Sequence, residues 1–302
     1  MTTEQAAQPP FQHLTVIGTG LIGGSLLMAA REAFPELHIR AVDQDENTLQ
    51  FILKHNVANA VTRELPSQWE ENHLIVLATH LNASYELLSN LAPQVEGLDI
   101  TLSDVGSCKR RIFEIGRQML PEQFIAGHPM AGREFSGVSS ATSLLFAGKS
   151  WLFCPHAGVK QARFERLQAF VEGLRGIPRT VTPDDHDRYM AYVSHLPQLY
   201  SVLLTNLIDR HEPGHLLSYH GGGIDDQLRL AASPHTMWGE VFAENADNLR
   251  AVAREMGVML GEMDDILDAP KLALWFERSN RLHQDFVSLK QNPDKFPTNQ
   301  VL

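Results

Sequence analysis

Residues 14–25, LTVIGTGLIGGS, decide the fold of this chain. The first four residues form an apolar, β-branched run that predicts a strand, and a helical pattern opens at Gly24. The glycines between them have the spacing GxGxxG, and Asp43 ends the next apolar run, 20 residues after Gly23. A strand, a glycine turn, a helix and an acid in this order predict a Rossmann unit that binds a dinucleotide.

Each glycine of the motif has a separate expected role. Gly18 permits the tight turn, Gly20 lets a pyrophosphate approach the backbone, and Gly23 lets the helix pack closely on the strand. The start of the helix then offers free N–H groups to the phosphates. We assign three further residues to the cofactor site: Leu21, Ile22 and Thr79.

Asp43 indicates which dinucleotide is bound. Its carboxylate is expected to accept hydrogen bonds from the ribose hydroxyls, and it would repel a 2′-phosphate. No arginine follows it, so NAD is favoured over NADP. The alternative is a glycine turn without a ligand and a solvated Asp43 at the end of a strand.

The rest of the first half repeats the alternation of strand and helix. Buried strands separated by helices predict a doubly wound, mostly parallel sheet with helices on both faces. Strands are expected over residues 39–42, 74–78, 100–103, 124–126, 151–154 and 179–181. Helices are expected over residues 25–33, 46–55, 83–91, 109–119 and 159–174.

The pattern changes at Thr182-Pro183, a predicted helix start with Thr182 as the N-cap. Only helical patterns follow, and they include residues 224–232, 237–256, 257–268 and 271–289. We therefore predict an α/β Rossmann domain over residues 11–183 and an all-α domain over residues 184–302.

Composition excludes several classes of protein. The 302 residues carry a formal net charge of −11, which argues against nucleic acid or anionic lipid as the main partner. No apolar stretch is long enough to span a membrane, and residues 1–12 lack the apolar core of a signal peptide. Cys108 and Cys154 form neither a disulfide framework nor a zinc motif, which favours a reducing compartment, the cytoplasm, and no metal site.

Three polar segments stand where packing alone would not require them. SDVGSCK, residues 103–109, and GHPMAG, residues 127–132, both follow predicted strands, at the sheet edge where open α/β sheets bind ligands. The third group lies in the helical half and comprises SHLPQ at 194–198, GGGIDDQLR at 221–229, and Met237-Trp238.

In this order and at these separations, the motifs resemble the prephenate/arogenate (cyclohexadienyl) dehydrogenase family of tyrosine biosynthesis. The resemblance runs from about residue 14 to about residue 280, and GHPMAG together with SHLP is far more specific than the glycine motif. It implies a Rossmann domain followed by a helical domain that forms a homodimer. It also implies oxidative decarboxylation of prephenate, arogenate or both by NAD⁺, which yields 4-hydroxyphenylpyruvate or tyrosine.

The resemblance assigns two catalytic residues. His128 matches the histidine that binds the substrate hydroxyl, and a neutral imidazole with a pKa of about 6.5 suits proton acceptance. Ser107 matches a serine near the same hydroxyl and the nicotinamide. The structural alternatives are that His128 caps a turn before Pro129 and that Ser107 caps the helix ending at Met119.

Four further residues are assigned to the substrate. His195 lines the pocket by resemblance, although composition alone indicates a core histidine. Arg229 matches the arginine that clamps a substrate carboxylate, with an ion pair to Asp225 or Asp226 as the alternative. Trp238 would form a wall of the pocket or belong to the core. Arg133 departs from the family, in which many members have a small polar residue after GHPMAG, and is either a second substrate contact or a bystander.

Two other functions remain open. Hydroxyacid dehydrogenases and pyrroline-carboxylate reductases share this architecture, but they usually rely on a different glycine motif or on a lysine in the helical domain. Residues 184–229 contain no lysine, and Lys109 is expected to be a solvated lysine in the first turn of a helix. An NAD-binding sensor without catalysis is the third interpretation, and the presence of His128, His195 and Arg229 together argues against it.

Overall fold

The fold was obtained as a computed structural model, which describes residues 8–133 and 136–291. Within them, eight strands form a sheet of order β3-β2-β1-β4-β5-β6-β7-β8. Adjacent strands are parallel except β6 and β7, which are antiparallel. The strands are β1 (His13–Ile17), β2 (His38–Val42), β3 (Ala60–Thr62), β4 (His73–Leu77), β5 (Ile100–Asp104), β6 (Phe124–Pro129), β7 (Ser150–Cys154) and β8 (Ile177–Thr180).

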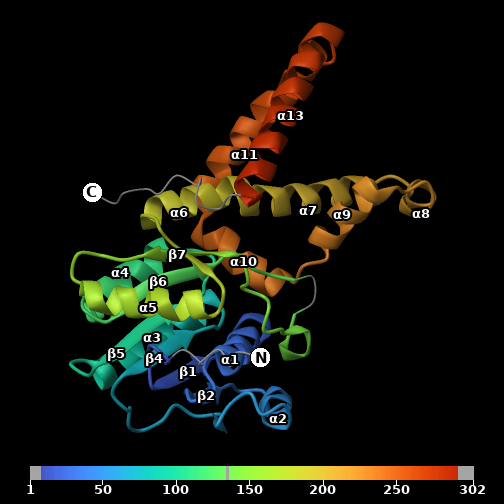
Figure 1. The fold of residues 1–302 in the computed structure, drawn as a ribbon. Helices are drawn as coiled ribbons and strands as arrows, with labels where there is room; N and C mark the ends of the chain where they lie inside the picture. Colours follow the sequence, from blue (N-terminus) through green and yellow to red (C-terminus); the bar gives the residue numbers. More distant parts are fainter. Residues whose placement is uncertain (1–7, 134–135, 292–302) are drawn as a thin grey trace, which may run out of the picture.

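Helices cover both faces of this sheet, as Figure 1 shows. In β4, Leu74 and Val76 join the core cluster beneath α1 and α5, whereas Ile75 and Leu77 join the cluster beneath α3 and α4. This alternation confirms the doubly wound Rossmann fold. The helices are α1 (Leu21–Ala33), α2 (Glu46–Lys54), α3 (Leu81–Val95), α4 (Arg110–Met119) and α5 (Gln161–Gly173), and a short 3₁₀ turn, η1 (Val138–Ser140), packs near α1.

The helical half begins where the sequence predicts. The Thr182 hydroxyl accepts a hydrogen bond from the amide of Asp185 at 3.1 Å, which caps α6. The described residues after Pro183 form no strand. They form α6 (Pro183–Met190), the π-helical segment η2 (Ala191–His195), α7 (Leu196–Asp209), α8 (Pro213–Leu217), α9 (Gly222–Ala231), α10 (His235–Glu244), α11 (Ala246–Gly261), α12 (Met263–Ile266) and α13 (Ala269–Gln291).

Several features differ from the sequence predictions: α8 was not expected, and residues 257–268 form the end of α11 and the short α12 instead of one helix. β3 was not predicted, because three half-buried residues are too few to form a pattern. The helix expected over residues 237–256 is broken at Asn245, which ends α10 and begins α11. Asn245 is fully buried, and its side chain bonds to other elements, so tertiary contacts override the continuous helical pattern.

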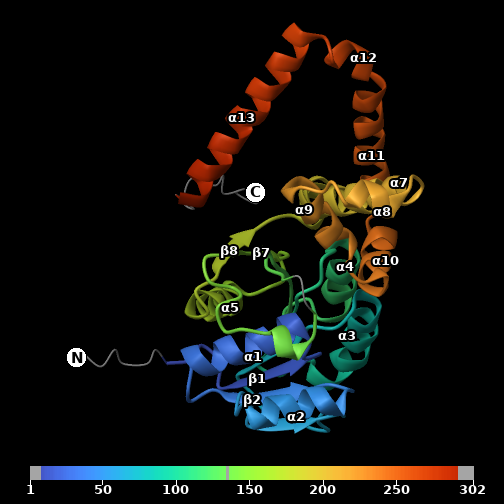
Figure 2. The ribbon, with the colours of Figure 1, turned by 90° about the vertical axis from the view of Figure 1, so that its right-hand side faces the viewer.

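The last three helices form an arch that stands away from the sheet (Figure 2). α11 rises from the level of α7, α12 makes the turn, and α13 descends on the other side. Phe276 and Leu282 on α13 are 63% and 70% exposed. Among the described residues, none of the helices has both the length and the apolar character needed to cross a bilayer.

The two halves meet at the carboxyl edge of the sheet. Val241 of α10 is buried within the cluster of α3 and α4, and its carbonyl accepts a hydrogen bond from the thiol of Cys108 at 3.7 Å. At the same edge, α6 packs against the start of α4. The ends of β5 and β6 therefore lie beneath the first helices of the second half.

Candidate active site

The glycine loop after β1 has the three geometries expected of it. Gly18 has a φ of +87°, a left-handed conformation that favours glycine. A Cβ on Gly23 would lie 1.9 Å from the carbonyl oxygen of Gly18, so only glycine permits this approach of helix and strand. A Cβ on Gly20 would meet nothing within 4 Å, which leaves the loop open on the side that a ligand would approach.

The beginning of α1 has the properties of an anion site. Gly20 is its N-cap, no side chain of the described residues caps it, and its first turn has no acidic residue. Its first N–H groups and the positive end of the helix dipole are therefore available to a phosphate. Leu21 and Ile22, the first two helical residues, pack partly buried against the core.

The structure adds a partner for Asp43 that the sequence did not show. One oxygen of its carboxylate accepts hydrogen bonds from the backbone amide and the hydroxyl of Thr19, at 2.6 and 2.8 Å. The other accepts from the amide of Asp45 at 3.0 Å. The carboxylate thus fixes the glycine loop and still has lone pairs for a ribose.

Thr79, which was also predicted to bind the cofactor, lies beside the same loop. It follows β4, and its Cγ2 lies 2.7 Å from the position that a Cβ on Gly18 would take. Its hydroxyl hydrogen-bonds the hydroxyl of Ser84 at 2.9 Å. The methyl group of Thr79 therefore closes the tight turn of the glycine loop.

Lys109 is a buried structural residue, and the expectation that it is solvated was wrong. Its side chain has no exposed surface, and its ammonium pairs with the carboxylate of Asp104 at the end of β5. It also donates to the carbonyl of Gly127 at 2.6 Å. The other oxygen of Asp104 accepts from the amide of Gly127 at 3.1 Å. The ion pair of Lys109 and Asp104 therefore links the loop that carries Ser107 to the strand that carries His128.

His128 belongs to a hydrogen-bonded series of three side chains. It lies on β6, half-buried, and its Nδ1 is 2.9 Å from Nε2 of His186 on α6. Nδ1 of His186 is 2.8 Å from Oδ1 of Asp187. The Asp187 carboxylate also accepts from the backbone amides of Lys109 and Arg110, at 2.7 and 3.1 Å. The imidazole at the sheet edge is thus held by the second half of the chain.

These environments keep the three histidines of the site neutral at physiological pH. Burial lowers the pKa of His128 well below 6.5, and the nearby His186, Lys109 and His195 lower it further. Burial likewise lowers the pKa of His186, although Asp187 opposes this, and burial lowers the pKa of His195 to about 4. Each imidazole therefore has one N–H donor and one acceptor nitrogen.

His195 lies at the end of the π-helical segment, directly before α7 and Pro197. Its ring is fully buried, with Nδ1 3.0 Å from the amide nitrogen of Asn245. Trp238 of α10 packs edge-on against it, with 6.1 Å between ring centroids. His195 Nε2 and Trp238 Nε1 are buried without a hydrogen-bond partner among the described residues.

Two further predicted residues are Ser107, which lies in the loop before α4, and Arg133, which lies on the surface. Ser107 is half-buried in the loop before α4, but Lys109 takes the N-cap position and the Asp187 carboxylate bonds the first amides. Ser107 is therefore not the helix cap. The guanidinium of Arg133 donates to the carbonyl of Ser140 at 3.0 Å on the surface.

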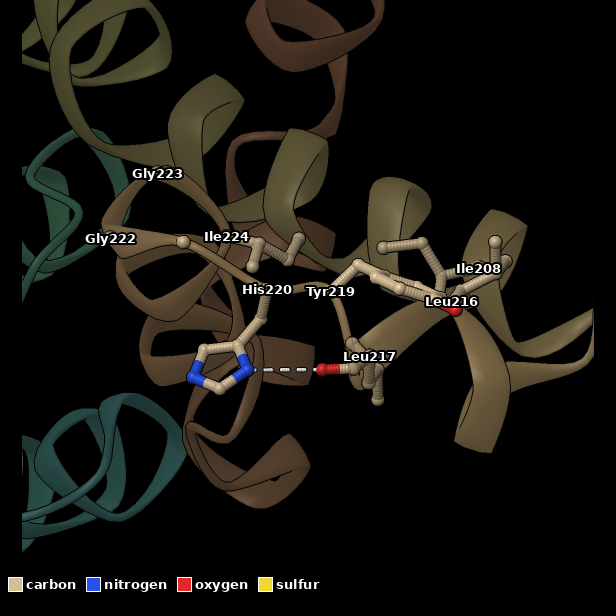
Figure 3. A pocket seen from close by; sticks show the side chains of 9 residues that line it. Ile208, Leu216, Leu217, Tyr219, His220, Gly222, Gly223 and Ile224 are labelled. Carbon is tan, nitrogen blue, oxygen red and sulfur yellow. Dashed lines mark hydrogen bonds between the residues drawn. The ribbon is translucent and has the colours of Figure 1, made fainter.

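Arg229 was predicted to bind a substrate carboxylate, with an ion pair to Asp225 or Asp226 as the structural alternative. It lies on α9, is 42% exposed, and pairs with Asp226 at 3.3 Å, which matches the structural alternative. A pocket of about 500 Å³ lies between α7, α8 and the start of α9 (Figure 3). Its lining includes Tyr219, His220 and residues 221–224, and none of the histidines of the site.

Sequence reasoning missed His186, Asp187 and Asn245. His186 and Asp187 follow the acidic residues of a helix start, a pattern typical of a solvated first turn, yet both are fully buried. Among the described residues, no group of three or more histidine, cysteine or acidic side chains could hold a metal.

Comparison with protein-family models gives two matches. Residues 28–177 match the family described as prephenate dehydrogenase, nucleotide-binding domain. Residues 182–276 match the family described as prephenate dehydrogenase, dimerization domain. Together they cover most of the chain, and only residues 178–181 lie between them.

Individual relatives agree with these matches. A prephenate dehydrogenase of Bacillus subtilis is 26% identical over 95% of this chain and 76% of its own length. A cyclohexadienyl dehydrogenase of Zymomonas mobilis is 26% identical over 80% of this chain and 84% of its own.

Solved structures show the same fold. Prephenate dehydrogenase from Aquifex aeolicus, in complex with hydroxyphenyl propionate and NAD⁺, has a TM-score of 0.81 at 22% identity and covers 94% of this chain and 100% of its own. Synechocystis arogenate dehydrogenase has a TM-score of 0.67 at 21% identity with the same coverages.

Proposed function

The chain belongs to the prephenate dehydrogenase family, and from that premise we propose that it oxidatively decarboxylates prephenate, arogenate or both with NAD⁺. The products are 4-hydroxyphenylpyruvate or tyrosine, together with CO₂ and NADH. The observation that carries the proposal is the position of His128, whose imidazole lies at the carboxyl edge of the same sheet as the glycine loop, with β4 and β5 between the two.

The loop after β1 fits the cofactor. Gly20 leaves space for the pyrophosphate, the uncapped start of α1 offers N–H groups to it, and Asp43 has lone pairs for the ribose. Leu21, Ile22 and Thr79 complete the proposed cofactor site. When bound, NAD⁺ supplies the acceptor for the hydride that the hydroxyl-bearing ring carbon loses.

His128 handles the proton of this reaction. It is neutral because its surroundings lower its pKa, so it can accept the hydroxyl proton as the ring carbon becomes a carbonyl carbon. The ring carboxylate then leaves as CO₂, its bonding electron pair makes the ring aromatic, and the former carbonyl oxygen becomes the phenolic oxygen that takes the proton back from His128. Ser107, in the loop before α4, is proposed to bind the same hydroxyl and to orient it toward His128.

The remaining predicted residues are proposed to bind the rest of the substrate. Nε2 of His195 and Nε1 of Trp238, buried without a hydrogen-bond partner among the described residues, are suited to its oxygens. Arg229 supplies the permanent positive charge that a dianion requires on a protein with a net charge of −11, and it would exchange Asp226 for a carboxylate. Arg133 is proposed as a second, outer contact.

The assembly and the domains follow the same proposal. We assign residues 11–183 to the NAD-binding domain and residues 184–302 to the dimerisation domain, of which residues 292–302 lie outside the described part. The exposed apolar side chains of α7 and α13, such as Leu203 at 58% and Leu282 at 70%, support a homodimer. The buried free thiols of Cys108 and Cys154 support a reducing compartment, the cytoplasm.

A paired assay tests the activity. Purified protein is mixed with NAD⁺ and either prephenate or arogenate, NADH is followed by absorbance, and the aromatic product is separated by chromatography. We expect turnover with at least one of the two substrates. NAD⁺ binding without turnover would favour the sensor interpretation, and turnover only in a parallel assay with hydroxyacids would favour the other dehydrogenase class.

A further inference from the structure

We propose that a hydrogen-bond framework centred on Asp187 and Asn245 holds His128 and His195 in opposite tautomers, so that Nε2 of His128 accepts a proton and Nε2 of His195 donates one. His186, Asp187 and Asn245 are positioning residues in this view. The catalytic meaning of the tautomers rests on the proposed function, but the tautomers themselves can be measured without turnover.

Asp187 determines which atoms of the framework donate hydrogen bonds and which accept them. Its buried carboxylate accepts from the amides of Lys109 and Arg110, and from Nε of Arg110 at 3.2 Å. Burial alone would raise the pKa of Asp187, but the hydrogen bonds from His186 and from these amides lower it. An ionised carboxylate only accepts hydrogen bonds, so Nδ1 of His186, at 2.8 Å, must carry the proton that it donates.

The same order of donor and acceptor continues from His186 to His128. His186 is neutral because burial lowers its pKa, so with a proton on Nδ1 its Nε2 is an acceptor. His128 Nδ1 lies 2.9 Å from that acceptor and must therefore be the donor. A neutral His128 with its proton on Nδ1 has a lone pair on Nε2, the state that a base for a hydroxyl group requires.

Asn245 sets the opposite state in His195. Its Oδ1 accepts from Arg110 at 3.2 Å and from Asn248 at 2.9 Å, and its Nδ2 donates to the carbonyl of Asp187 at 2.7 Å. The orientation of the amide is therefore fixed. Since Nδ2 is also the atom facing Nδ1 of His195 at 3.0 Å, that nitrogen accepts and the imidazole proton lies on Nε2.

The N–H donor on Nε2 of His195 indicates a binding site for a ligand oxygen. Nε2 of His195 and Nε1 of Trp238, whose rings are in contact, are both buried without a partner among the described residues. Such donors are costly unless a ligand satisfies them. We infer that they bind an oxygen of the substrate, while the acceptor on His128 receives the hydroxyl, so a single orientation of the substrate suits both.

The direct test is nitrogen NMR of the full chain labelled with ¹⁵N-histidine. The shifts of the two ring nitrogens distinguish the tautomers, and spectra of His128→Asn and His195→Asn assign the signals. We expect His128 protonated at Nδ1 and His195 protonated at Nε2 near neutral pH, without any ligand. The same tautomer in both rings, or the reverse arrangement, overturns the proposal.

A pair of variants tests the His186 connection. His186→Gln keeps one donor and one acceptor, so we expect it to retain the tautomer of His128 and most of kcat. His186→Leu removes both, and we expect a mixed tautomer and a kcat lower by about 100-fold, with KM little changed. His73→Leu is the matched control, since His73 is equally buried at the opposite edge of the sheet. It should lower stability and leave kcat unchanged.

Asn245→Asp tests the hydrogen bond between Asn245 and His195. A carboxylate at this position accepts instead of donating, so the proton of His195 should move to Nδ1 and KM for the substrate should rise about 10-fold. An unchanged His195 signal in folded protein contradicts the proposal, as does equal kcat in the His186→Leu and His186→Gln variants. If the NMR result holds and neither substrate turns over, the proposed function fails while the tautomer assignment stands.

Discussion

Gly23 and Gly20 should separate the stability of the fold from the binding of the cofactor. In Gly23→Ala, the new Cβ would lie 1.9 Å from the carbonyl oxygen of Gly18, whereas ordinary contact begins at 3.4 Å. Helix and strand must therefore move apart by about 1.5 Å, the difference between these two distances. Overpacking of this kind costs about 3 kcal/mol, which for a chain of 302 residues corresponds to a fall in Tm of roughly 5 °C.

Gly20→Ala is the matched control, because its Cβ would meet nothing within 4 Å. We expect its Tm to stay within about 1 °C of the parent, while Kd for NAD⁺ rises at least about 10-fold, since the methyl group occupies the space proposed for the pyrophosphate. Thermal unfolding and calorimetric titration measure the two quantities. Equal Tm values for both variants, or unchanged NAD⁺ affinity in Gly20→Ala, would refute this account of the loop.

Three further predictions concern the site and the core. His128→Asn should lower kcat by about 100-fold or more with little change in KM, and Arg229→Ala should chiefly raise KM; steady-state kinetics showing the reverse would mean that the two roles are exchanged. Lys109→Met should lower the free energy of unfolding by about 3–5 kcal/mol, because Asp104 is left buried and unpaired, and adding Asp104→Leu should restore part of it in urea titrations. Burial lowers the pKa of His73 to about 4, so between pH 6.5 and 4 the unfolded chain binds more protons, and stability should fall by up to about 3 kcal/mol as pH decreases through this window. His73→Gln should flatten that slope, and an equal slope in both proteins would show that His73 is not its source.

The site was only partly predictable from the sequence, and the reason differs from residue to residue. His128 could be placed at the carboxyl edge because a strand pattern ends beside it. Lys109 was misjudged because a lysine in a first turn is usually solvated, and only the approach of β5 and β6 buries it against Asp104. Asn245 was placed inside a continuous helix because the helical pattern runs through it without interruption.

Local order along the chain determined the Rossmann half and the start of the helical half. Turns, caps and the alternation of apolar residues act over a few neighbouring positions, so the glycine loop, Asp43 and the cap at Thr182 were visible in the sequence. Tertiary structure alone decided which side chains meet at the site. His128, His186 and Asn245 come from three elements far apart in sequence, and the directions of their hydrogen bonds exist only once the helical half has folded onto the sheet.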